Sequence, residues 1–292
     1  MKTKTFTPIF LCAVVSVLVI TCGCTMPSQT AQGKQLTVFA AASLTDAFTE
    51  IGQSYHSNHS DTNISFNFDG SQILQTQIEN GAYADVFASA SNIQMNALKN
   101  EGYMNNSTVN VFAQNKLEVI IPKDNAAHIA SMSDLAKPGM KIVIGTQAVP
   151  VGNYTLQVLN KMANDTTYGP DYKNKVLSNV VSQEPNVNNI VTKVALGEAD
   201  AGFVYHSDVP LKQVAQVDRI IIPDTYNVVA RYPIGALKQS KDPVLAQDFI
   251  NYVNSAAGQA ILQKYGFIVP QGSTSQHATM AGVTSQRITA MA

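Results

Sequence analysis

Short apolar runs alternate with amphipathic stretches along most of the chain, beginning at residue 35. The first part reads as strand, helix, strand, helix and strand in the segments 35–40, 43–55, 64–68, 73–81 and 85–90. Runs of β-branched and aromatic residues predict strands, and apolar residues three or four positions apart predict helices. This regular alternation is typical of the α/β class, in which helices cover a largely parallel sheet.

The same alternation continues through the rest of the chain. Further strands are predicted at 116–122, 141–145, 201–205 and 219–223, and helices from about residue 153 to 162 and over 187–198. Residues 242–270 place apolar positions at helical spacing through two helices, which we expect to pack on the body as a pair. Residues 271–292 are rich in Ser, Thr, Ala and Gln and have no periodic apolar face, so they predict a disordered tail.

The folded part of the chain is too long for one ordinary α/β core. It comprises about 245 residues, which exceeds the usual size of a single domain. We therefore expect two α/β lobes, the first built from residues 35–114 and 228–270 and the second from residues 115–227. The chain would cross between the lobes near Gln114 and Asn227.

The N-terminus has the layout of an export signal. Two lysines precede an apolar run over residues 8–20, and a stretch of small residues ends at Cys24. The apolar run is shorter than the roughly 20 residues that a membrane-spanning helix needs, so we expect residues 1–23 to be removed and residues 24–34 to form a linker. The mature protein is then expected to work outside the cytoplasm, in the periplasm or at the cell surface.

The cysteines all lie in or next to this segment. Gly23 and Cys24 resemble the end of a lipoprotein signal, so we expect a lipid on Cys24 that holds the protein at the membrane surface. Lipidation at Cys22, or secretion without a lipid, are the alternatives. Because the remaining cysteine is Cys12, the folded body has none for a disulfide or a zinc site.

The composition excludes one class of partner, and the motifs of catalysis are missing. The formal net charge is −1 and 13% of the residues are charged, so the chain lacks the basic surface that nucleic-acid binding requires. No G-x-S-x-G motif, phosphate-binding loop or dinucleotide motif is present. We expect no enzyme. An exported hydrolase with Ser43 or Ser71 as nucleophile is the alternative from another class, although neither serine has a visible base or orienting acid.

A recurring pattern marks the points where predicted strands end. A small or hydroxyl residue follows the strand, and a helix begins at once. Ser43 stands at the N-cap position of one such helix, with Asp46 three residues later as in a capping box. Ser71 would cap the next helix, after a turn in which Gly70 gives the backbone freedom. Each junction alone is explained by an ordinary capped helix.

Two later junctions share the pattern. Pro150 fixes the backbone before a helix, so that the amide of Val151 can lie bare. Asn186 and Val187 open another helix, after which the chain returns through a strand that ends at Tyr205. Helix N-termini present unpaired amides and a partial positive charge, so they hold anions without a cationic side chain. Four converging junctions would form a pocket of neutral donors, suited to a fully ionised oxyanion.

These motifs resemble the periplasmic molybdate-binding proteins of ABC transporters. The resemblance covers nearly the whole expected mature chain and is carried by VFAAASLTDAF, FDGSQILQTQI, ADVFASAS, VPVGNYTLQVL and VNNIVTKVALGEADAGFVYHSDV. It implies a two-lobed periplasmic-binding-protein fold of type II, with a mixed sheet flanked by helices in each lobe. The ligand would lie in the cleft between the lobes.

The resemblance also implies a ligand, a set of binding residues and partners. The ligand would be molybdate or tungstate, bound with high affinity and delivered to an ABC permease and its ATPase subunit. In that family two hydroxyl residues, two backbone amides and a tyrosine surround the oxyanion, and by motif position these are Ser43, Ser71, Val151, Val187 and Tyr205. The metal would be held only through the oxyanion oxygens.

Several finer expectations follow from the same resemblance. A related archaeal branch adds carboxylates that raise the coordination of the metal, but Val151 and Val187 are not acidic, so tetrahedral binding is favoured even though Glu184 is near. We expect a monomer without a resident cofactor. A sulfate-type oxyanion-binding protein is the alternative within the same class.

Overall fold

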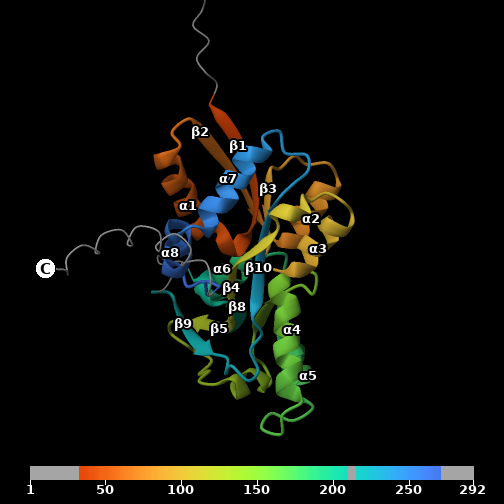
Figure 1. The fold of residues 1–292 in the computed structure, drawn as a ribbon. Coiled ribbons are helices and arrows are strands. Elements are labelled where there is room, and N and C mark those ends of the chain that lie inside the picture. Colours follow the sequence, from red (N-terminus) through yellow and green to blue (C-terminus); the bar gives the residue numbers. More distant parts are fainter. Residues whose placement is uncertain (1–32, 210–214, 271–292) are drawn as a thin grey trace, which may run out of the picture. The chain divides into compact units, whose positions relative to one another are not determined.

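The structure, a computed structural model, describes residues 33–209 and 215–270 (Figure 1). The predicted signal segment 1–23, the predicted lipid site at Cys24 and the predicted tail 271–292 lie outside these residues. Most of the predicted linker 24–34 also lies outside them.

The first sheet has five strands in the order β2-β1-β3-β10-β4. Strand β1 is parallel to both of its neighbours, and β10 is antiparallel to both of its own, so the sheet is mixed. The strands are β1 (Lys34–Ala41), β2 (Thr62–Asp69), β3 (Val86–Ala88), β4 (Asn110–Asn115) and β10 (Ala230–Ala236).

The second sheet also has five strands, in the order β7-β6-β8-β5-β9. Strand β6 is parallel to β7 and β8, whereas β5 is antiparallel to β8 and β9. The strands are β5 (Leu117–Pro122), β6 (Ile142–Gly145), β7 (Val180–Glu184), β8 (Ala201–Tyr205) and β9 (Val217–Ile221). The chain passes from the first sheet to the second between β4 and β5, and it returns between β9 and β10.

Helices pack against each sheet. Among the described residues the α-helices are α1 (Thr45–Asn58), α2 (Ser71–Glu79), α3 (Asn92–Asn100), α7 (Pro243–Asn254) and α8 (Ala256–Lys264), associated with the first sheet, and α4 (Pro150–Ala163), α5 (Tyr172–Ser178) and α6 (Val187–Ala195), associated with the second. Short 3₁₀ turns are η1 (Ala42–Leu44), η2 (Asn106–Thr108), η3 (Met132–Ala136) and η4 (His206–Asp208). We call each sheet with its helices a lobe: the first lobe lies in the upper half of Figure 1 and the second in the lower half. The predicted α/β class, with a mixed sheet flanked by helices in each lobe, is confirmed.

Two predicted helical features can be compared with the structure. The helix expected from about residue 153 begins earlier, at Pro150. Proline is favoured in the first turn, because a backbone amide there would make no hydrogen bond within the helix. The predicted C-terminal pair is present as α7 and α8, which contact each other and α1. Their apolar faces bury Phe249 and Leu262, among others.

The local sequence explains how the helices attach to the sheets. In α6 the buried residues are Val187, Ile190, Val191 and Val194, spaced as one face of a helix requires. This face lies on β5, β6 and β8, and Gly202 of β8 has no room for a Cβ because the Ile190 side chain would be 2.6 Å from it. Close packing here fixes where α6 begins.

The core of the first lobe is aromatic. Phe48 of α1 packs against Phe112 and Phe249, with ring centroids 5.6 and 6.2 Å apart, and Tyr55 lies 5.6 Å from Phe249. Full burial of a side chain of this size contributes about 1.5–3 kcal/mol. These aromatic residues thus join α1 and α7 to each other and to β4.

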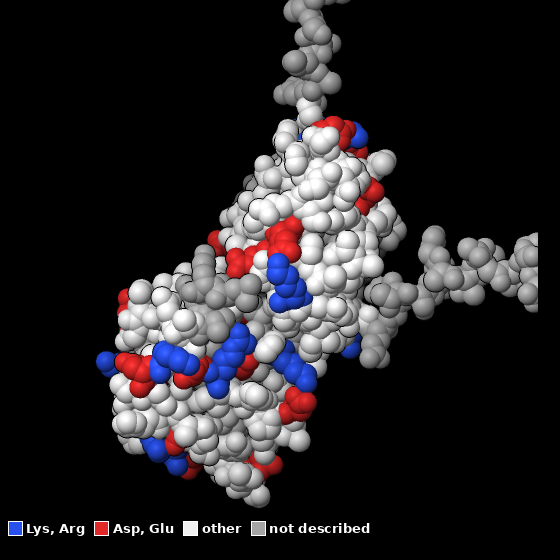
Figure 2. All heavy atoms as spheres, turned by 90° about the vertical axis from the view of Figure 1, so that its left-hand side faces the viewer, with Lys and Arg blue, Asp and Glu red and all other residues white. Residues whose placement is uncertain are grey.

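Charged side chains are sparse on the surface and mixed in sign. Figure 2 shows the left-hand side of Figure 1, where Lys, Arg, Asp and Glu are scattered over a largely uncharged surface. Several of them pair, as Lys264 does with Glu50 and Lys116 with Asp224. Within the described residues, none of the helices is long and apolar enough to cross a membrane.

Candidate functional site

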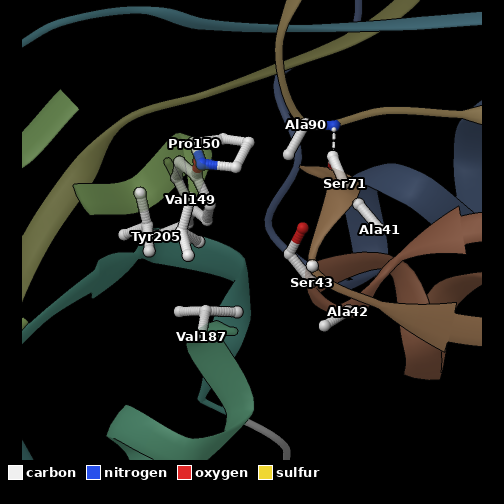
Figure 3. Close-up of a pocket in the computed structure, with 11 residues that line it drawn as sticks. Ala41, Ala42, Ser43, Ser71, Ala90, Val149, Pro150, Val187 and Tyr205 are labelled. Atoms are coloured by element: carbon white, nitrogen blue, oxygen red, sulfur yellow. Dashed lines mark hydrogen bonds between the residues drawn. The ribbon is translucent and has the colours of Figure 1, made fainter. Parts of the chain in front are cut away.

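One small pocket lies between the two lobes, and all five residues predicted as ligands line it. The first lobe contributes the end of β1 with η1, the start of α2 and the residue after Ser89, and the second lobe contributes the starts of α4 and α6 and the end of β8 (Figure 3). The lining residues are Ala41, Ala42, Ser43, Gly70, Ser71, Ala90, Val149, Pro150, Val151, Val187 and Tyr205. The cavity has a volume of about 20 Å³.

Ser43 reaches the pocket in a different way from the predicted one. It is not an N-cap: a 3₁₀ turn is inserted between β1 and α1, so Leu44 precedes the helix and the Ser43 side chain makes no capping bond. The predicted capping box with Asp46 is therefore wrong. The Ser43 Oγ instead lies 3.0 Å from the Oη of Tyr232, within hydrogen-bond distance.

Ser71 is the first residue of α2, and Gly70 occupies the N-cap position, so the prediction of Ser71 as the cap is also wrong. The Ser71 Oγ accepts a 3.0 Å hydrogen bond from the amide of Ala90. Because its oxygen is engaged in this way, its O–H is free to donate to a group in the pocket. The side chain is buried, so it has few other orientations.

Gly70 is required by space and not by backbone freedom. Its φ is −56°, which any residue adopts. A Cβ at this position would lie 2.4 Å from the carbonyl oxygen of Pro185, in the other lobe. The two lobes therefore lie in close contact beside Ser71.

The second lobe supplies bare backbone amides. Val151 is the second residue of α4, and its amide has no hydrogen-bond partner among the described residues. Val187 is the first residue of α6, and its amide is likewise unpaired there, whereas the Asn186 side chain caps the amide of Asn189 at 3.2 Å. Free amides of this kind, with the partial positive charge of a helix start, favour a bound anion.

Tyr205 ends β8 and closes the pocket. Its side chain is 1% exposed, and its Oη has no hydrogen-bond partner among the described residues. Burial raises the pKa of Tyr205 well above its usual value, so the hydroxyl keeps its proton and acts as a donor. The rings of Tyr154 and Tyr232 hold it in place, with centroids 6.3 and 5.8 Å away.

The pocket is neutral. No Lys, Arg, His, Asp or Glu is among its lining residues, and its polar groups are hydroxyls and amides. Glu184, which the sequence left as a potential extra ligand, does not line the pocket. Its carboxylate accepts hydrogen bonds from Lys193 at 2.6 Å and from Ser182. Burial raises the pKa of Glu184, but these bonds outweigh burial and lower its pKa overall.

Sequence reasoning missed Tyr232. This residue lies on β10 and is fully buried, and it reaches Ser43 only because β10 returns from the second sheet to pair with β3. Ser43 and Tyr232 are 189 positions apart in the sequence, so their contact leaves no local signal there. No group of three or more His, Cys, Asp or Glu that could hold a metal ion occurs within residues 33–209 and 215–270.

The arrangement can bind but offers little for catalysis. Among residues 33–209 and 215–270, the Ser43 side chain has only Tyr232 as a hydrogen-bond partner, and the Ser71 side chain has only the Ala90 amide. Neither serine is bonded to a histidine or carboxylate that could remove its proton. A small anion held by fixed donors is what the geometry accommodates.

Comparison with known proteins places this geometry in context. The sequence model of the family described as "Bacterial extracellular solute-binding protein" matches residues 36–268. The chain is 36% identical over 256 residues to the protein named molybdate-binding protein ModA of Mycobacterium tuberculosis, covering 86% of this chain and 93% of that one. It is 30% identical over 263 residues to the putative ABC transporter substrate-binding lipoprotein YvgL of Bacillus subtilis, covering 89% and 96%.

A solved structure supports the fold. The periplasmic molybdate-binding protein of Azotobacter vinelandii superposes with a TM-score of 0.69 at 20% sequence identity, covering 81% of this chain and all of the other. At this identity the likeness concerns the fold alone. It confirms the predicted two-lobed periplasmic-binding-protein fold.

Proposed function

Because this chain belongs to the family of bacterial extracellular solute-binding proteins, we propose that its interlobe pocket binds a tetrahedral oxyanion, molybdate or tungstate, for delivery to an ABC permease. The observation that carries the proposal is the convergence of all five predicted ligands, Ser43, Ser71, Val151, Val187 and Tyr205, on one neutral pocket. Members of this family bind solutes outside the cytoplasm, so the exported serine hydrolase considered as an alternative is excluded.

The donors favour an anion without protons. Three hydroxyls and two bare amides line the pocket and can donate hydrogen bonds into it, while the oxygen of Ser71 already accepts a hydrogen bond from the Ala90 amide. The unpaired Tyr205 hydroxyl gains its missing partner when an anion is bound. A protonated phosphate would need an acceptor for its own hydrogen, and the pocket lining offers no carboxylate for it.

The size of the pocket suits a single tetrahedral ion. The cavity has a volume of about 20 Å³, which leaves room for one small solute and not for an extended molecule. Since Glu184 is engaged elsewhere, four oxygens around the metal complete the coordination, and the chain supplies only hydrogen bonds to them.

The same proposal covers the anchor, the lobes and the oligomeric state. The B. subtilis relative is described as a lipoprotein, which supports a lipid on Cys24. The moving lobes consist of residues 35–114 with 228–270 and of residues 115–227, and the membership of the two sheets supports these boundaries. The protein acts as a monomer, since one chain supplies every donor of the pocket.

The test is calorimetric titration of the chain from residue 24 onward, with Cys24 changed to serine, using molybdate, tungstate, sulfate and phosphate. We expect tight binding of molybdate and tungstate only. The double variant Ser43→Ala, Ser71→Ala should lose most of the affinity, since each hydrogen bond to a charged group contributes about 1.5–3 kcal/mol. Two exposed serines, changed in Ser57→Ala, Ser178→Ala, provide the matched control and should leave binding intact. Tight sulfate binding would change the ligand, and no response to any of the four anions would refute the proposal.

A further inference from the structure

Side-chain amides bridge the two lobes around the pocket. Gln72 of the first lobe donates a 2.8 Å hydrogen bond to the carbonyl oxygen of Pro185 in the second. In the opposite direction, the Nδ2 of Asn186 donates to the Oδ1 of Asp69 at 3.1 Å, and the Nδ2 of Asn188 donates to the carbonyl oxygen of Ala42 at 3.3 Å. All three bonds join residues that are more than 100 positions apart in the sequence.

Each bridging residue is a near neighbour of a proposed ligand. Asp69 and Gln72 flank Gly70 and Ser71, Ala42 precedes Ser43, and Pro185, Asn186 and Asn188 surround Val187. The bridges therefore exist only while the proposed ligands of the two lobes face each other. Separation of the lobes would break them together.

The pair formed by Asp69 and Asn186 is the best defined of these bridges. The Oδ1 of Asn186 accepts the amide of Asn189 and so caps α6, which fixes the direction of its Nδ2 towards Asp69. The Oδ1 of Asp69 also accepts the amide of Gly70 at 2.7 Å, which fixes the carboxylate. Two groups that are oriented from both sides lose little side-chain freedom when they meet.

We propose that Asp69 and Asn186 form an interlobe latch that slows release of the bound anion. The proposal rests on the proposed function, because it holds that the hydrogen bond between Asp69 and Asn186, outside the pocket, controls how long the same anion stays bound. The latch places a carboxylate two residues before Ser71, so Asp69 accepts hydrogen bonds at the rim and is not itself a ligand of the anion. Hydrogen bonds that exist only in the closed form lower its free energy relative to the open form, and release then requires breaking them.

The test is a double-mutant cycle on release kinetics. The chain contains no tryptophan, and Tyr205 lines the pocket with Tyr154 and Tyr232 packed against its ring, so stopped-flow tyrosine fluorescence can follow displacement of molybdate. Asn186→Ser removes the latch donor but keeps a residue that caps helices well. We expect it to speed release roughly tenfold in the wild-type background and to have little effect in an Asp69→Ala background. Equal effects in both backgrounds would overturn the latch.

Two further variants distinguish the effect of the latch hydrogen bond from that of the Asp69 charge and from a general disturbance of α6. Asp69→Asn keeps an acceptor oxygen without the charge and should keep slow release within about threefold. Asn189→Ser changes an exposed side chain on the same helix turn and should behave like the wild type. Faster release in Asn189→Ser than in Asn186→Ser would overturn the assignment.

A ligand-free measurement keeps this proposal distinct from the proposed function. Small-angle X-ray scattering of the protein without anion reports how open the lobes are. The latch predicts a larger radius of gyration for Asp69→Ala and for Asn186→Ser than for the wild type, whether or not molybdate binds. Unchanged scattering in both variants would refute the latch, and absence of oxyanion binding with changed scattering would refute only the proposed function.

Discussion

The Tyr205 hydroxyl lies in the wall of the pocket without a hydrogen-bond partner among the described residues. A buried hydroxyl in this state destabilises a fold by about 1–3 kcal/mol relative to one that is paired. A phenylalanine would fill the same space without that penalty. The Tyr205 hydroxyl thus lowers the stability of the ligand-free protein. A hydrogen bond to an oxygen of the proposed anion would explain why the residue is tyrosine.

We predict opposite effects of Tyr205→Phe on stability and on binding. The free energy of unfolding without anion should stay level or rise by about 1 kcal/mol, because a lone buried hydroxyl is removed. Molybdate affinity should fall roughly 10- to 100-fold, because a hydrogen bond to a charged oxygen is lost. Urea unfolding and calorimetry on the same preparation measure the two quantities.

Tyr172→Phe is the matched control for this prediction. The Tyr172 hydroxyl is also buried, but it donates a 2.6 Å hydrogen bond to the carbonyl oxygen of Met132, far from the pocket lining. Its loss should lower the free energy of unfolding by about 1 kcal/mol and leave affinity unchanged. If Tyr205→Phe behaves in the same way as Tyr172→Phe, the role given to Tyr205 is wrong.

At the scale of elements, two helix starts contribute only backbone amides to the proposed anion site. The amides of Val151 and Val187 are free because the first turn of a helix has no internal acceptor for them. The side chains of both residues are buried in the hydrophobic core. An amide can therefore be tested separately from the side chain only by a residue that lacks the amide hydrogen.

Val187→Pro makes this test, since proline is well tolerated as the first residue of a helix. The preceding residue, Asn186, has an extended backbone (φ −152°, ψ 165°), which suits a following proline. We expect the fold to survive at a stability cost of about 1 kcal/mol and molybdate affinity to fall about tenfold. Calorimetry and thermal unfolding check the two effects.

Asn92→Pro is the corresponding control, at the first position of α3. Its preceding residue is also extended, with φ −154° and ψ 146°, and Asn92 does not line the pocket. Affinity should stay the same in this variant. An equal loss of affinity in both proline variants would indicate a general disturbance of the fold and contradict the role of the Val187 amide.

The C-terminal helix is tied to α1 by a small charged cluster. The Glu50 carboxylate accepts a 2.6 Å bond from Lys264 and a 2.7 Å bond from the Tyr265 hydroxyl. The hydrogen bond from Lys264, and then that from Tyr265, lower the pKa of Glu50. The same carboxylate raises the pKa of Tyr265 to about 12.

The cluster predicts a pH dependence of stability. A lowered carboxyl pKa stabilises the fold above the unfolded value of 4.5, and this contribution is lost as the pH falls through the folded pKa. The raised pKa of Tyr265 contributes below pH 10 and is lost as the pH rises towards 12. Glu50→Gln should therefore lower the free energy of unfolding by at most about 1 kcal/mol near neutral pH and by less at both extremes.

Urea unfolding at a series of pH values measures this difference. Glu101→Gln, which changes an exposed carboxylate without a recorded partner among the described residues, is the control and should give no such profile. A constant difference between wild type and Glu50→Gln at every pH would contradict the assignment.

The sequence predicted the elements better than the details of the junctions. Strand and helix runs follow from apolar periodicity, and the start of α6 follows from its Asn186 cap, so these were predictable. The prediction failed at Ser43 because a 3₁₀ turn moves the N-cap of α1 one residue on, to Leu44, and at Ser71 because Gly70 takes the cap position. Such shifts depend on where and in which direction β1 and β2 end at the cleft. The helix-capping preferences of single residues do not determine this.

At the scale of the whole molecule, the protein carries the same sign of charge as its proposed ligand. Removing residues 1–23 takes away two lysines, which changes the net charge from −1 to −3. Within the part of the chain that the structure describes, no cation lines the pocket, and the latch contains no ion pair. Binding therefore does not rely on long-range attraction.

This arrangement predicts a weak dependence on salt. Raising sodium chloride from about 0.05 to 0.5 M screens the general repulsion, so the association rate should rise slightly and the dissociation constant should change by less than about threefold. Stopped-flow and calorimetric titrations at several salt concentrations measure both. A tenfold loss of affinity with salt would point to a cationic site and contradict the neutral pocket.

The long-range parts of the site could not be predicted from the sequence. Tyr232 reaches Ser43, and Asn186 reaches Asp69, only after two sheets have formed and faced each other. The five proposed ligand positions, which line one pocket, could still be predicted, because the resemblance carried them motif by motif. The partners that orient them belong to other elements and have no fixed spacing from the motifs.

The use of backbone amides at Val151 and Val187 has a consequence for how such a site evolves. Nineteen of the twenty amino acids supply the same amide hydrogen, so mutation at these positions can change the side chain freely, within the limits of core packing, while the donor persists. Conservation of the binding site then depends less on residue identity than on where each helix starts. It also requires that the residue supplying the amide is not proline. Distant descendants could share this specificity while their sequences differ at the very positions that contact the anion.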